Sequence, residues 1–357
     1  MKKIQANNYS IELGSIVKSS FTNFISDEYK DSKKIILVDE NTHDCCLEYL
    51  LTSFDGLKDA EVMLLPVGEE NKVLEVCFQV WEALSEYKVS RKDLIINLGG
   101  GVVTDMGGFI ASIYKRGVDF INIPTSLLGM VDASIGGKTG VDLGRFKNQL
   151  GTFTIPKALF IDAGFLNTLP KEELLNGYAE MLKHALISSK DYWNQLISIS
   201  KIDDLAKGDL IKTSIEIKND IVKSDPKEVN ERKKLNFGHT IGHAIEGLFL
   251  AKNPISHGHA VGIGMLAESF ISLKRGILSE TDWNEISEVL MALFPILPIS
   301  LEDIDTIIEL MRNDKKNSED QIKSCLLTSI GSCIYDQDLS IEEIKESLYF
   351  LIAKHDQ

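Results

Sequence analysis

The chain has 357 residues, of which 44% are hydrophobic and 25% charged, a composition typical of a globular protein with length for two domains. Its formal net charge of −15 disfavours nucleic acid and anionic membrane surfaces as partners. The five cysteines are scattered and odd in number, which favours a reducing cytoplasm over a disulfide framework. We expect neither a signal peptide nor a membrane span.

Alternating strands and helices are predicted for the first half of the chain. Five short runs rich in β-branched residues end at turn residues, as buried parallel strands do. These runs are residues 34–38, 60–65, 93–98, 120–123 and 158–161. A helix is predicted over 73–87, so βαβ units follow. The pattern predicts an α/β domain over residues 1–170.

Long amphipathic stretches replace this pattern after Leu169-Pro170, and strand-like runs become scarce. Helices are predicted over residues 171–188, 205–224, 235–249, 259–275 and 282–293. Residues 323–327 are either a late strand or a core segment. We therefore predict a second, mostly helical domain over residues 171–357.

A glycine turn, Gly99-Gly100-Gly101, follows a predicted strand and opens a predicted helix. Glycines at such a place let the backbone approach a pyrophosphate, whose charge suits the helix N-terminus. The spacing differs from the usual dinucleotide fingerprint, and a tight turn without a ligand has the same pattern. Asp39, at the end of an early strand, either accepts a hydrogen bond from a ribose hydroxyl or only ends the strand in a turn.

A second glycine-rich segment runs from Asp132 to Gly140 and contains Lys138. It lacks the four-residue gap of a Walker A motif, so we predict a flexible loop here. Neighbouring cations form either an anion site or a solvated surface run. The cations are Lys115, Arg116, Lys138, Arg145 and Lys147.

Four of the seven histidines lie within residues 239–259. His239 and His243 are four apart, so on a helix they share a face, and His257 and His259 follow. Neutral imidazole is the commonest metal ligand, and a catalytic zinc uses three protein ligands and an open position. The pattern favours a metal site over incidental histidines.

Glu180 and Lys183 share a predicted helix face that is otherwise apolar. The Glu180 carboxylate is a candidate third ligand beside two histidines; the alternative is a weak intrahelical ion pair. Further polar residues are candidates for holding a phosphorylated, carboxylate-bearing substrate, each with a plain surface role as the alternative. They are Lys218, Arg232, Asn236, Lys315 and Lys316.

Seven motifs, in order, make the chain resemble the 3-dehydroquinate synthase family from about residue 39 to 331. They are residues 97–105, 124–128, 131–139, 147–148, 179–183, 235–244 and 257–258. The resemblance implies a Rossmann-like NAD-binding domain followed by a mostly α-helical metal-binding domain, one Zn²⁺ or Co²⁺, and a homodimer. The implied reaction converts 3-deoxy-D-arabino-heptulosonate 7-phosphate to 3-dehydroquinate and phosphate in the shikimate pathway. It proceeds by transient oxidation with NAD, phosphate elimination, re-reduction, ring opening and intramolecular aldol closure.

The resemblance also implies roles residue by residue. Glu180, His239 and His257 match metal ligands, and His243 matches a catalytic histidine. Substrate-binding positions are matched by Arg116, Asp132, Lys138, Asn148, Lys183, Lys218, Arg232, Asn236 and, of the pair Lys315 and Lys316, by Lys316. The cofactor's surroundings are matched by Asp39, Asn41, Glu69, Lys72, Gly99, Gly100, Gly101, Val102, Val103, Asp105, Thr125, Ser126, Lys138, Lys147, Phe165, Leu166, Asn167 and Thr168.

The chain departs from the family pattern at four positions. Thr104 and Phe146 stand where glycine is usual, Ser126 replaces a threonine, and His259 is unusual, so the ligand is either His257 or His259. The alternative functions are another sugar-phosphate cyclase, a metal-dependent polyol or alcohol dehydrogenase of the same fold, and a non-catalytic binding protein. The intact histidines and cations argue against the last.

Overall fold

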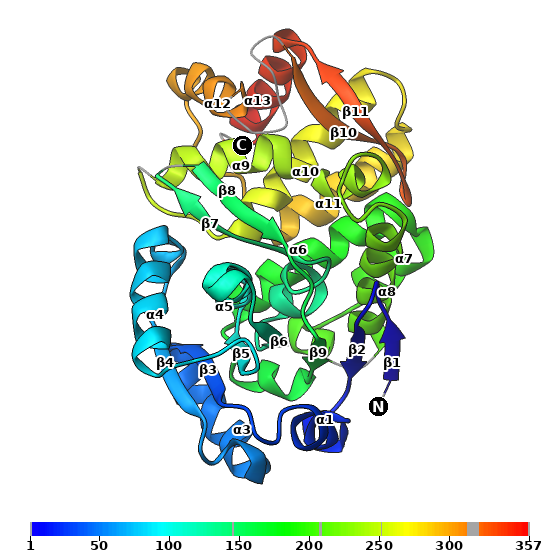
Figure 1. Cartoon of the computed structure of the whole chain (residues 1–357). Helices are drawn as coiled ribbons and strands as arrows, with labels where there is room; N and C mark the ends of the chain where they lie inside the picture. Colours follow the sequence, from blue (N-terminus) through cyan, green and yellow to red (C-terminus); the bar gives the residue numbers. More distant parts are fainter. Residues whose placement is uncertain (1, 145, 207–208, 251, 313–320, 356–357) are drawn as a thin grey trace. The chain divides into compact units, whose positions relative to one another are not determined.

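The computed structural model describes residues 2–144, 146–206, 209–250, 252–312 and 321–355 (Figure 1). They form two compact units. Unit 1 is Met1–Leu174 with Ala206–Asn219, and unit 2 is Leu175–Leu205 with Asp220–Gln357. No helix in the described part of the chain combines the length and apolarity that crossing a membrane requires.

A seven-stranded sheet forms the centre of unit 1, in the order β1-β2-β9-β6-β5-β3-β4. Neighbouring strands are parallel except β1 and β2, which are antiparallel. The five predicted strands are confirmed as β3, β4, β5, β6 and β9, and the predicted α/β class with them. The bounds are β1 Lys2–Gln5, β2 Ser10–Leu13, β3 Lys34–Asp39, β4 Glu61–Leu65, β5 Leu94–Gly99, β6 Asp119–Pro124 and β9 Ala158–Ile161.

The order of these strands identifies one end of the sheet as a place for ligands. Strand β3 pairs with β4 on one side and with β5 on the other, so the chain reverses its direction of winding between β4 and β5. Open α/β sheets bind ligands at the carboxyl ends of the strands at such a switch point. Asp39 ends β3 and Gly99 ends β5, so both lie there.

Helices pack against this sheet through a buried apolar cluster. Its side chains include Leu37 from β3, Ile95 from β5, Leu84 from α4 and Ile110 from α5, and each is fully buried. Burial of such a side chain stabilises the fold by about 1.5–3 kcal/mol. The predicted helix over 73–87 is confirmed as α4. The α-helices that lie wholly within unit 1 are α1 Phe21–Glu28, α2 Glu40–Thr42, α3 Glu48–Ser53, α4 Leu74–Glu86 and α5 Gly101–Ile113.

The segment that follows Asp132 corrects a prediction. Instead of a flexible loop, β7 (Lys138–Leu143) and β8 (Phe146–Phe153) form an antiparallel hairpin. Gly140 pairs with Gly151, and a Cβ on Gly140 would lie only 2.6 Å from a backbone oxygen of the opposite strand. The glycines that suggested flexibility therefore let two backbones approach closely.

Unit 2 is mostly helical, as predicted. The helices predicted over 171–188, 205–224, 259–275 and 282–293 are confirmed as α6, α8, α10 and α11, although the first residues of α6 and of α8 up to Asn219 belong to unit 1. Residues 323–327 lie in a strand, β10, which pairs with β11. The bounds are α6 Lys171–Ser188, α7 Lys190–Ile197, α8 Asp209–Ser224, α9 His239–Leu250, α10 His257–Lys274, α11 Glu280–Leu293, α12 Ile304–Arg312, α13 Ile341–His355, β10 Ile322–Ser329 and β11 Ser332–Leu339.

The start of α9 also differs from the prediction. The helix begins at His239 rather than at residue 235, because Gly238 has a φ of +80°, a left-handed conformation that interrupts a helix. A separate 3₁₀ turn covers Glu231–Asn236. Helix α10 begins at His257, one residue after its cap Ser256. Two of the four clustered histidines are therefore the first residues of helices.

Candidate functional site

Helices α9 and α10 approach closely because glycines line their contact. A Cβ on Gly264 would lie 1.9 Å from the carbonyl oxygen of Gly238, and a Cβ on Gly242 would lie 2.8 Å from that of Ala260. Any larger residue at these places would force the helices apart, since interiors are closely packed. These glycines therefore bring the two histidine-bearing helices together.

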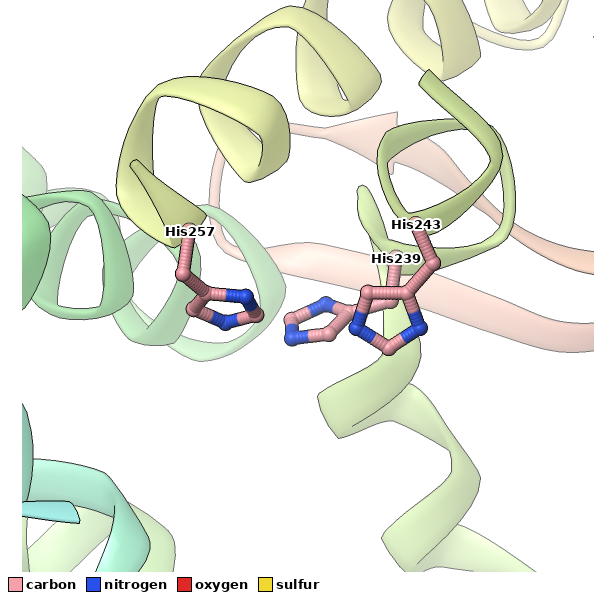
Figure 2. A group of neighbouring side chains, drawn as sticks. All are labelled: His239, His243 and His257. Atoms are coloured by element: carbon pink, nitrogen blue, oxygen red, sulfur yellow. The ribbon is translucent and has the colours of Figure 1, made fainter. Parts of the chain in front are cut away.

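Three imidazoles converge at this contact (Figure 2). His239 and His243 come from one face of α9, and His257 comes from the start of α10. The ring centroids lie 5.0 Å apart for His239 and His243, 5.6 Å for His239 and His257, and 5.7 Å for His243 and His257. One nitrogen from each ring lies within 4.8 Å of the others, a spacing at which they can hold one metal ion.

Glu180, fully buried on α6, lies against two of these rings. Its Oε1 is 3.4 Å from Nε2 of His239 and 3.6 Å from Nε2 of His257. Its other oxygen, Oε2, forms an ion pair with Lys183, which is also buried. The contact with the histidines and the intrahelical ion pair, which the sequence left as alternatives, thus occur together.

Asn176 connects the start of α10 to the helix that carries Glu180. Its side-chain oxygen accepts a hydrogen bond of 3.0 Å from the backbone N–H of Gly258. A Cβ on Gly258 would lie 2.5 Å from the Cα of Asn176, so only glycine allows this approach. Because Asn176 precedes Glu180 by one helical turn, the contact places His257 beside the carboxylate.

Burial and charge act differently on the two imidazoles beside Glu180. Burial, together with the ammonium of Lys183, lowers the pKa of His239 and favours its neutral form. Burial opposes the charge on His257 too, but Glu246 and Glu180 outweigh it and raise the pKa of His257 to about 10. Binding of a metal ion at His257 would therefore release a proton.

His259 does not join this cluster. Its Nε2 donates a hydrogen bond of 2.6 Å to the carbonyl oxygen of Pro295, and its ring lies 6.2 Å from that of Phe294. Of the two histidines between which the sequence left the choice open, His257 is the one beside Glu180.

In unit 1 the glycine turn has little space for side chains. A Cβ on Gly99 would lie 2.5 Å from Cβ of Val103, and a Cβ on Gly100 would lie 3.2 Å from Oγ of Ser126. Thr125 donates its backbone N–H to the carbonyl oxygen of Gly99 at 3.0 Å. Five of the predicted cofactor-binding residues thus meet where α5 begins, and a helix N-terminus attracts anions.

Two other predicted cofactor segments follow parallel strands of the same sheet. Asp39 caps α2, since its Oδ1 accepts a 2.8 Å hydrogen bond from the backbone N–H of Thr42. Asn41 is exposed on this short helix. The segment Ala163–Thr168 follows β9 as a 3₁₀ turn capped by Asp162. The carboxyl ends of parallel strands meet at one edge, so these segments lie at the same edge as the glycine turn.

Lys72 joins several predicted residues of unit 1. Its buried ammonium lies 2.7 Å from Oδ2 of Asp105 and 2.8 Å from Oδ1 of Asn148. Burial opposes its charge, but Asp105 and Glu69 outweigh this and raise the pKa of Lys72. Lys147 lies 3.6 Å from Glu69. Residues predicted for the cofactor and a residue predicted for the substrate therefore share one network.

The other predicted substrate-binding residues of unit 1 are partly brought together. Lys218 lies 2.8 Å from Oδ1 of Asp132 and donates a 2.6 Å hydrogen bond to the carbonyl oxygen of Asp132. Lys138 is exposed at the start of β7. Arg116 is exposed as well, with a left-handed φ of +65°.

In unit 2 two predicted substrate-binding residues lie on the turn before α9. Arg232 is buried and donates a 2.7 Å hydrogen bond to the carbonyl oxygen of Pro226. Asn236 donates one of 2.7 Å to Glu228. The remaining predicted residues, Lys315 and Lys316, lie outside the described part of the chain.

The sequence did not single out three buried polar residues around the histidines: Asn176, Glu246 and Glu268. Glu268 accepts backbone hydrogen bonds of 2.7 Å from Gly238 and 3.2 Å from Ile241, and so caps the start of α9. Glu246 lies 3.5 Å from Nδ1 of His257. A lone carboxylate in an apolar helical run is the signal that could have identified Glu246 and Glu268.

Comparisons with known proteins agree with this geometry. Residues 62–176 match a family model described as 3-dehydroquinate synthase N-terminal, and residues 177–317 match one described as 3-dehydroquinate synthase C-terminal. The 3-dehydroquinate synthase of Parabacteroides distasonis is 41% identical over 337 residues, which cover 94% of this chain and 95% of that protein. That of Clostridium botulinum is 39% identical over 334 residues, covering 92% and 94%.

Two solved structures share the fold over nearly the whole chain. The 2-epi-5-epi-valiolone synthase ValA from Streptomyces hygroscopicus, with NAD⁺ and Zn²⁺ bound, superposes with a TM-score of 0.83 at 27% identity and covers 99% of both chains. A 2-deoxy-scyllo-inosose synthase complexed with carbaglucose-6-phosphate, NAD⁺ and Co²⁺ has a TM-score of 0.83 at 25% identity, covering 99% of this chain and 100% of that one. Because both family models match and relatives near 40% identity extend along almost its whole length, this chain belongs to the 3-dehydroquinate synthase family.

Proposed function

We propose that the protein is an active 3-dehydroquinate synthase, which converts 3-deoxy-D-arabino-heptulosonate 7-phosphate to 3-dehydroquinate and phosphate in the shikimate pathway. The observation that carries this proposal is the convergence of Glu180, His239, His243 and His257 in a chain of this family. A protein that had lost catalysis would have no need to keep a buried carboxylate and three imidazoles around one point.

The donors at this point fit a divalent metal ion. Ligand atoms at about 2.0–2.1 Å from a tetrahedral ion lie about 3.3–3.4 Å from one another. The separations of Glu180 Oε1 from the two Nε2 atoms, 3.4 and 3.6 Å, are close to this value. We therefore assign Glu180, His239 and His257 as ligands of one Zn²⁺ or Co²⁺, with a position open to substrate oxygens. The bound ion supplies Lewis acidity toward a substrate oxygen.

The carboxyl edge of the parallel sheet fits NAD. The first backbone N–H groups of α5 lack partners within the helix, and its cap Gly100 has no side chain to accept from them; Asp39 ends the neighbouring strand β3. We assign the turn to the pyrophosphate and Asp39 to the adenosine ribose. The residues that line the rest of this site are those predicted from the sequence, among them Lys72, Asp105, Thr125 and Ser126. Bound NAD supplies a hydride acceptor that is regenerated in each turnover.

The remaining predicted residues hold the substrate and move its protons. His243 is half-buried, with its ring 5.0 Å from that of His239, so it can contact a substrate bound at the ion and act as an acid or base there. The cations and amides assigned to the phosphate and carboxylate are Arg116, Lys138, Asn148, Lys183, Lys218, Arg232, Asn236 and Lys316. The division into a cofactor domain, residues 1–170, and a metal and substrate domain, residues 171–357, is part of the proposal, as are a homodimer and a cytoplasmic location.

One assay tests the proposed reaction. Phosphate release from the heptulosonate phosphate is measured with NAD and either Zn²⁺ or Co²⁺, while the nicotinamide absorbance is followed. We expect phosphate and 3-dehydroquinate in equal amounts and no accumulation of NADH. Turnover of glucose 6-phosphate instead would indicate a related cyclase, and accumulation of NADH with an alcohol would indicate a dehydrogenase.

A further inference from the structure

We propose that Glu246 is a positioning residue of the metal site, which accepts the Nδ1–H of His257 and so directs the Nε2 lone pair of His257 toward the ion. This inference rests on the metal site proposed above. Glu246 is not a ligand in it; the carboxylate acts through the imidazole.

The geometry of His257 carries the proposal. Nε2 lies 3.6 Å from Oε1 of Glu180, while Nδ1, on the opposite side of the ring, lies 3.5 Å from Oε2 of Glu246. A carboxylate oxygen accepts, so Glu246 holds a proton on Nδ1, and the proton that a bound ion displaces is the one on Nε2. Binding of an ion between His257 and Glu180 requires this arrangement, with the lone pair on Nε2.

His239 has the same arrangement with a different acceptor. Its Nε2 lies 3.4 Å from the same oxygen of Glu180, and its Nδ1 donates a 3.0 Å hydrogen bond to the carbonyl oxygen of Phe237. In both imidazoles Nε2 thus faces Oε1 of Glu180, and Nδ1, on the opposite side of the ring, contacts a hydrogen-bond acceptor. For His239 the acceptor belongs to the backbone, whereas for His257 it is a side chain that can be replaced.

Charge supports the same role. Glu180 is ion-paired with Lys183, and both side chains are buried, so part of the attraction of Glu180 for a cation is offset. Glu246 is 3% exposed and brings a second carboxylate to His257. Charges act strongly where water is excluded, so this carboxylate makes His257 a more basic ligand.

Two variants separate orientation from charge. Glu246→Gln keeps an oxygen that accepts from Nδ1 but removes the charge, and Glu246→Leu removes both. Loss of such a partner costs about 10–100-fold in metal affinity. We therefore expect Zn²⁺ affinity, measured by competition with a chromophoric chelator, to fall about tenfold in Glu246→Gln and toward 100-fold in Glu246→Leu. The absorption spectrum of bound Co²⁺ should also differ from that of the parent, less in Glu246→Gln than in Glu246→Leu.

Thermal unfolding of the metal-free proteins distinguishes positioning from general stability. Glu285→Gln is the matched control: Glu285 accepts from the Trp193 indole at 2.7 Å and belongs to the same unit. The role of Glu246 is supported if its glutamine variant unfolds like the control without metal but binds Zn²⁺ more weakly. Parent-like affinity and an unchanged Co²⁺ spectrum in Glu246→Gln would overturn it. A parent chain that binds neither ion would instead overturn the proposed metal site, and the role of Glu246 with it.

Discussion

The glycine turn of unit 1 and the histidine cluster of unit 2 use glycine for different purposes. In unit 1 the helix cap Gly100 offers no side-chain hydrogen bond to the first turn of α5, so the proposed pyrophosphate contacts come from the main chain. In unit 2, glycines bring α9 and α10 together, and the proposed metal ligands are side chains that this packing positions. A side chain added to the glycine turn of unit 1 should therefore obstruct NAD, whereas removal of a side chain from the histidine cluster of unit 2 should abolish metal binding or catalysis.

Loss of a metal ligand should have the largest effect. His257→Ala should lose bound metal and, with it, turnover, because His257 lies 3.6 Å from Glu180. His259→Ala is the matched control, since His259 contacts Pro295 instead. Metal content after dialysis and phosphate release are the measurements. Retention of metal by His257→Ala together with its loss from His259→Ala would reverse the assignment.

Removal of the third imidazole should separate metal binding from catalysis. His243→Ala should retain metal, because Glu180, His239 and His257 remain, but kcat should fall by about 10²–10⁴-fold, the usual contribution of a general acid or base. Metal content and kcat are measured on the same preparation. A metal-free His243→Ala protein would show that the three histidines, whose nitrogens lie within 4.8 Å, are the ligands.

A side chain in the glycine turn should affect the cofactor alone. In Gly100→Ala the new Cβ lies 3.2 Å from Oγ of Ser126, which small adjustments can accommodate, but on the proposed function it obstructs the approach of the pyrophosphate. Loss of one charge-assisted hydrogen bond costs about 1.5–3 kcal/mol, so the Kd for NAD should rise about tenfold or more. Titration calorimetry with NAD and a Zn²⁺ affinity measurement test this. Weakened Zn²⁺ binding with unchanged NAD binding would contradict the division of labour.

The carboxylate of Asp39 should give a smaller effect, on cofactor choice. An acidic group beside the adenosine ribose favours a free 2′-hydroxyl and repels a 2′-phosphate, so the parent should bind NAD more tightly than NADP. Asp39→Asn keeps an oxygen that can accept from Thr42 and should narrow this preference. Titration of both cofactors into both proteins measures it. Equal affinity of the parent for the two would show that Asp39 only caps α2.

The smallest effect should appear in the framework behind the cluster. Arg275, just after α10, forms a 2.5 Å hydrogen bond with Glu343 of α13 and lowers the pKa of Glu343 to about 2. Since the folded pKa is depressed, its stabilisation is present above the unfolded value near 4.3 and is lost as pH falls toward 2. Arg275→Gln should reduce stability at pH 7 by about 1 kcal/mol or less and hardly at all at pH 2. Denaturant unfolding at both pH values measures this; equal losses would contradict the pairing.

The sequence predicted the elements that follow from a local residue pattern, but not those that depend on two backbones packing closely together. Apolar runs identified β3 to β6 and β9, and the spacing of His239 and His243 identified one face of α9. The β7–β8 hairpin was missed because Gly140 and Gly151 permit flexibility as readily as strand pairing, and only contacts decide between them. The start of α9 at His239 was missed because the conformation of Gly238 depends on its packing against α10.

The sequence also did not predict which residues position other functional residues. Glu246 and His257 are eleven positions apart, on two helices, and nothing in their spacing indicates which ring nitrogen faces the carboxylate. Asp39 was expected to bind a ribose or to end a strand, and the structure shows that its Oδ1 caps α2 while its ribose role stays a prediction. Only tertiary contacts decide which residue a carboxylate such as Glu246 contacts.

The return of α8 to unit 1 has a consequence for the order in which the chain folds as it leaves the ribosome. Asn219 donates a hydrogen bond to the backbone of Gln5, and Lys218 pairs with Asp132. In the sequence, residues 175–205 separate α8 from the rest of unit 1, and these residues belong to unit 2. Unit 1 is therefore incomplete until residue 219 has been synthesised, by which time part of unit 2 has already emerged. Such distant pairings slow folding, because the intervening chain must be closed into a loop first. A nascent chain that ends at residue 174 lacks Lys218, the partner of Asp132, so unit 1 can complete this pairing only after residues 175–205 of unit 2 have been synthesised.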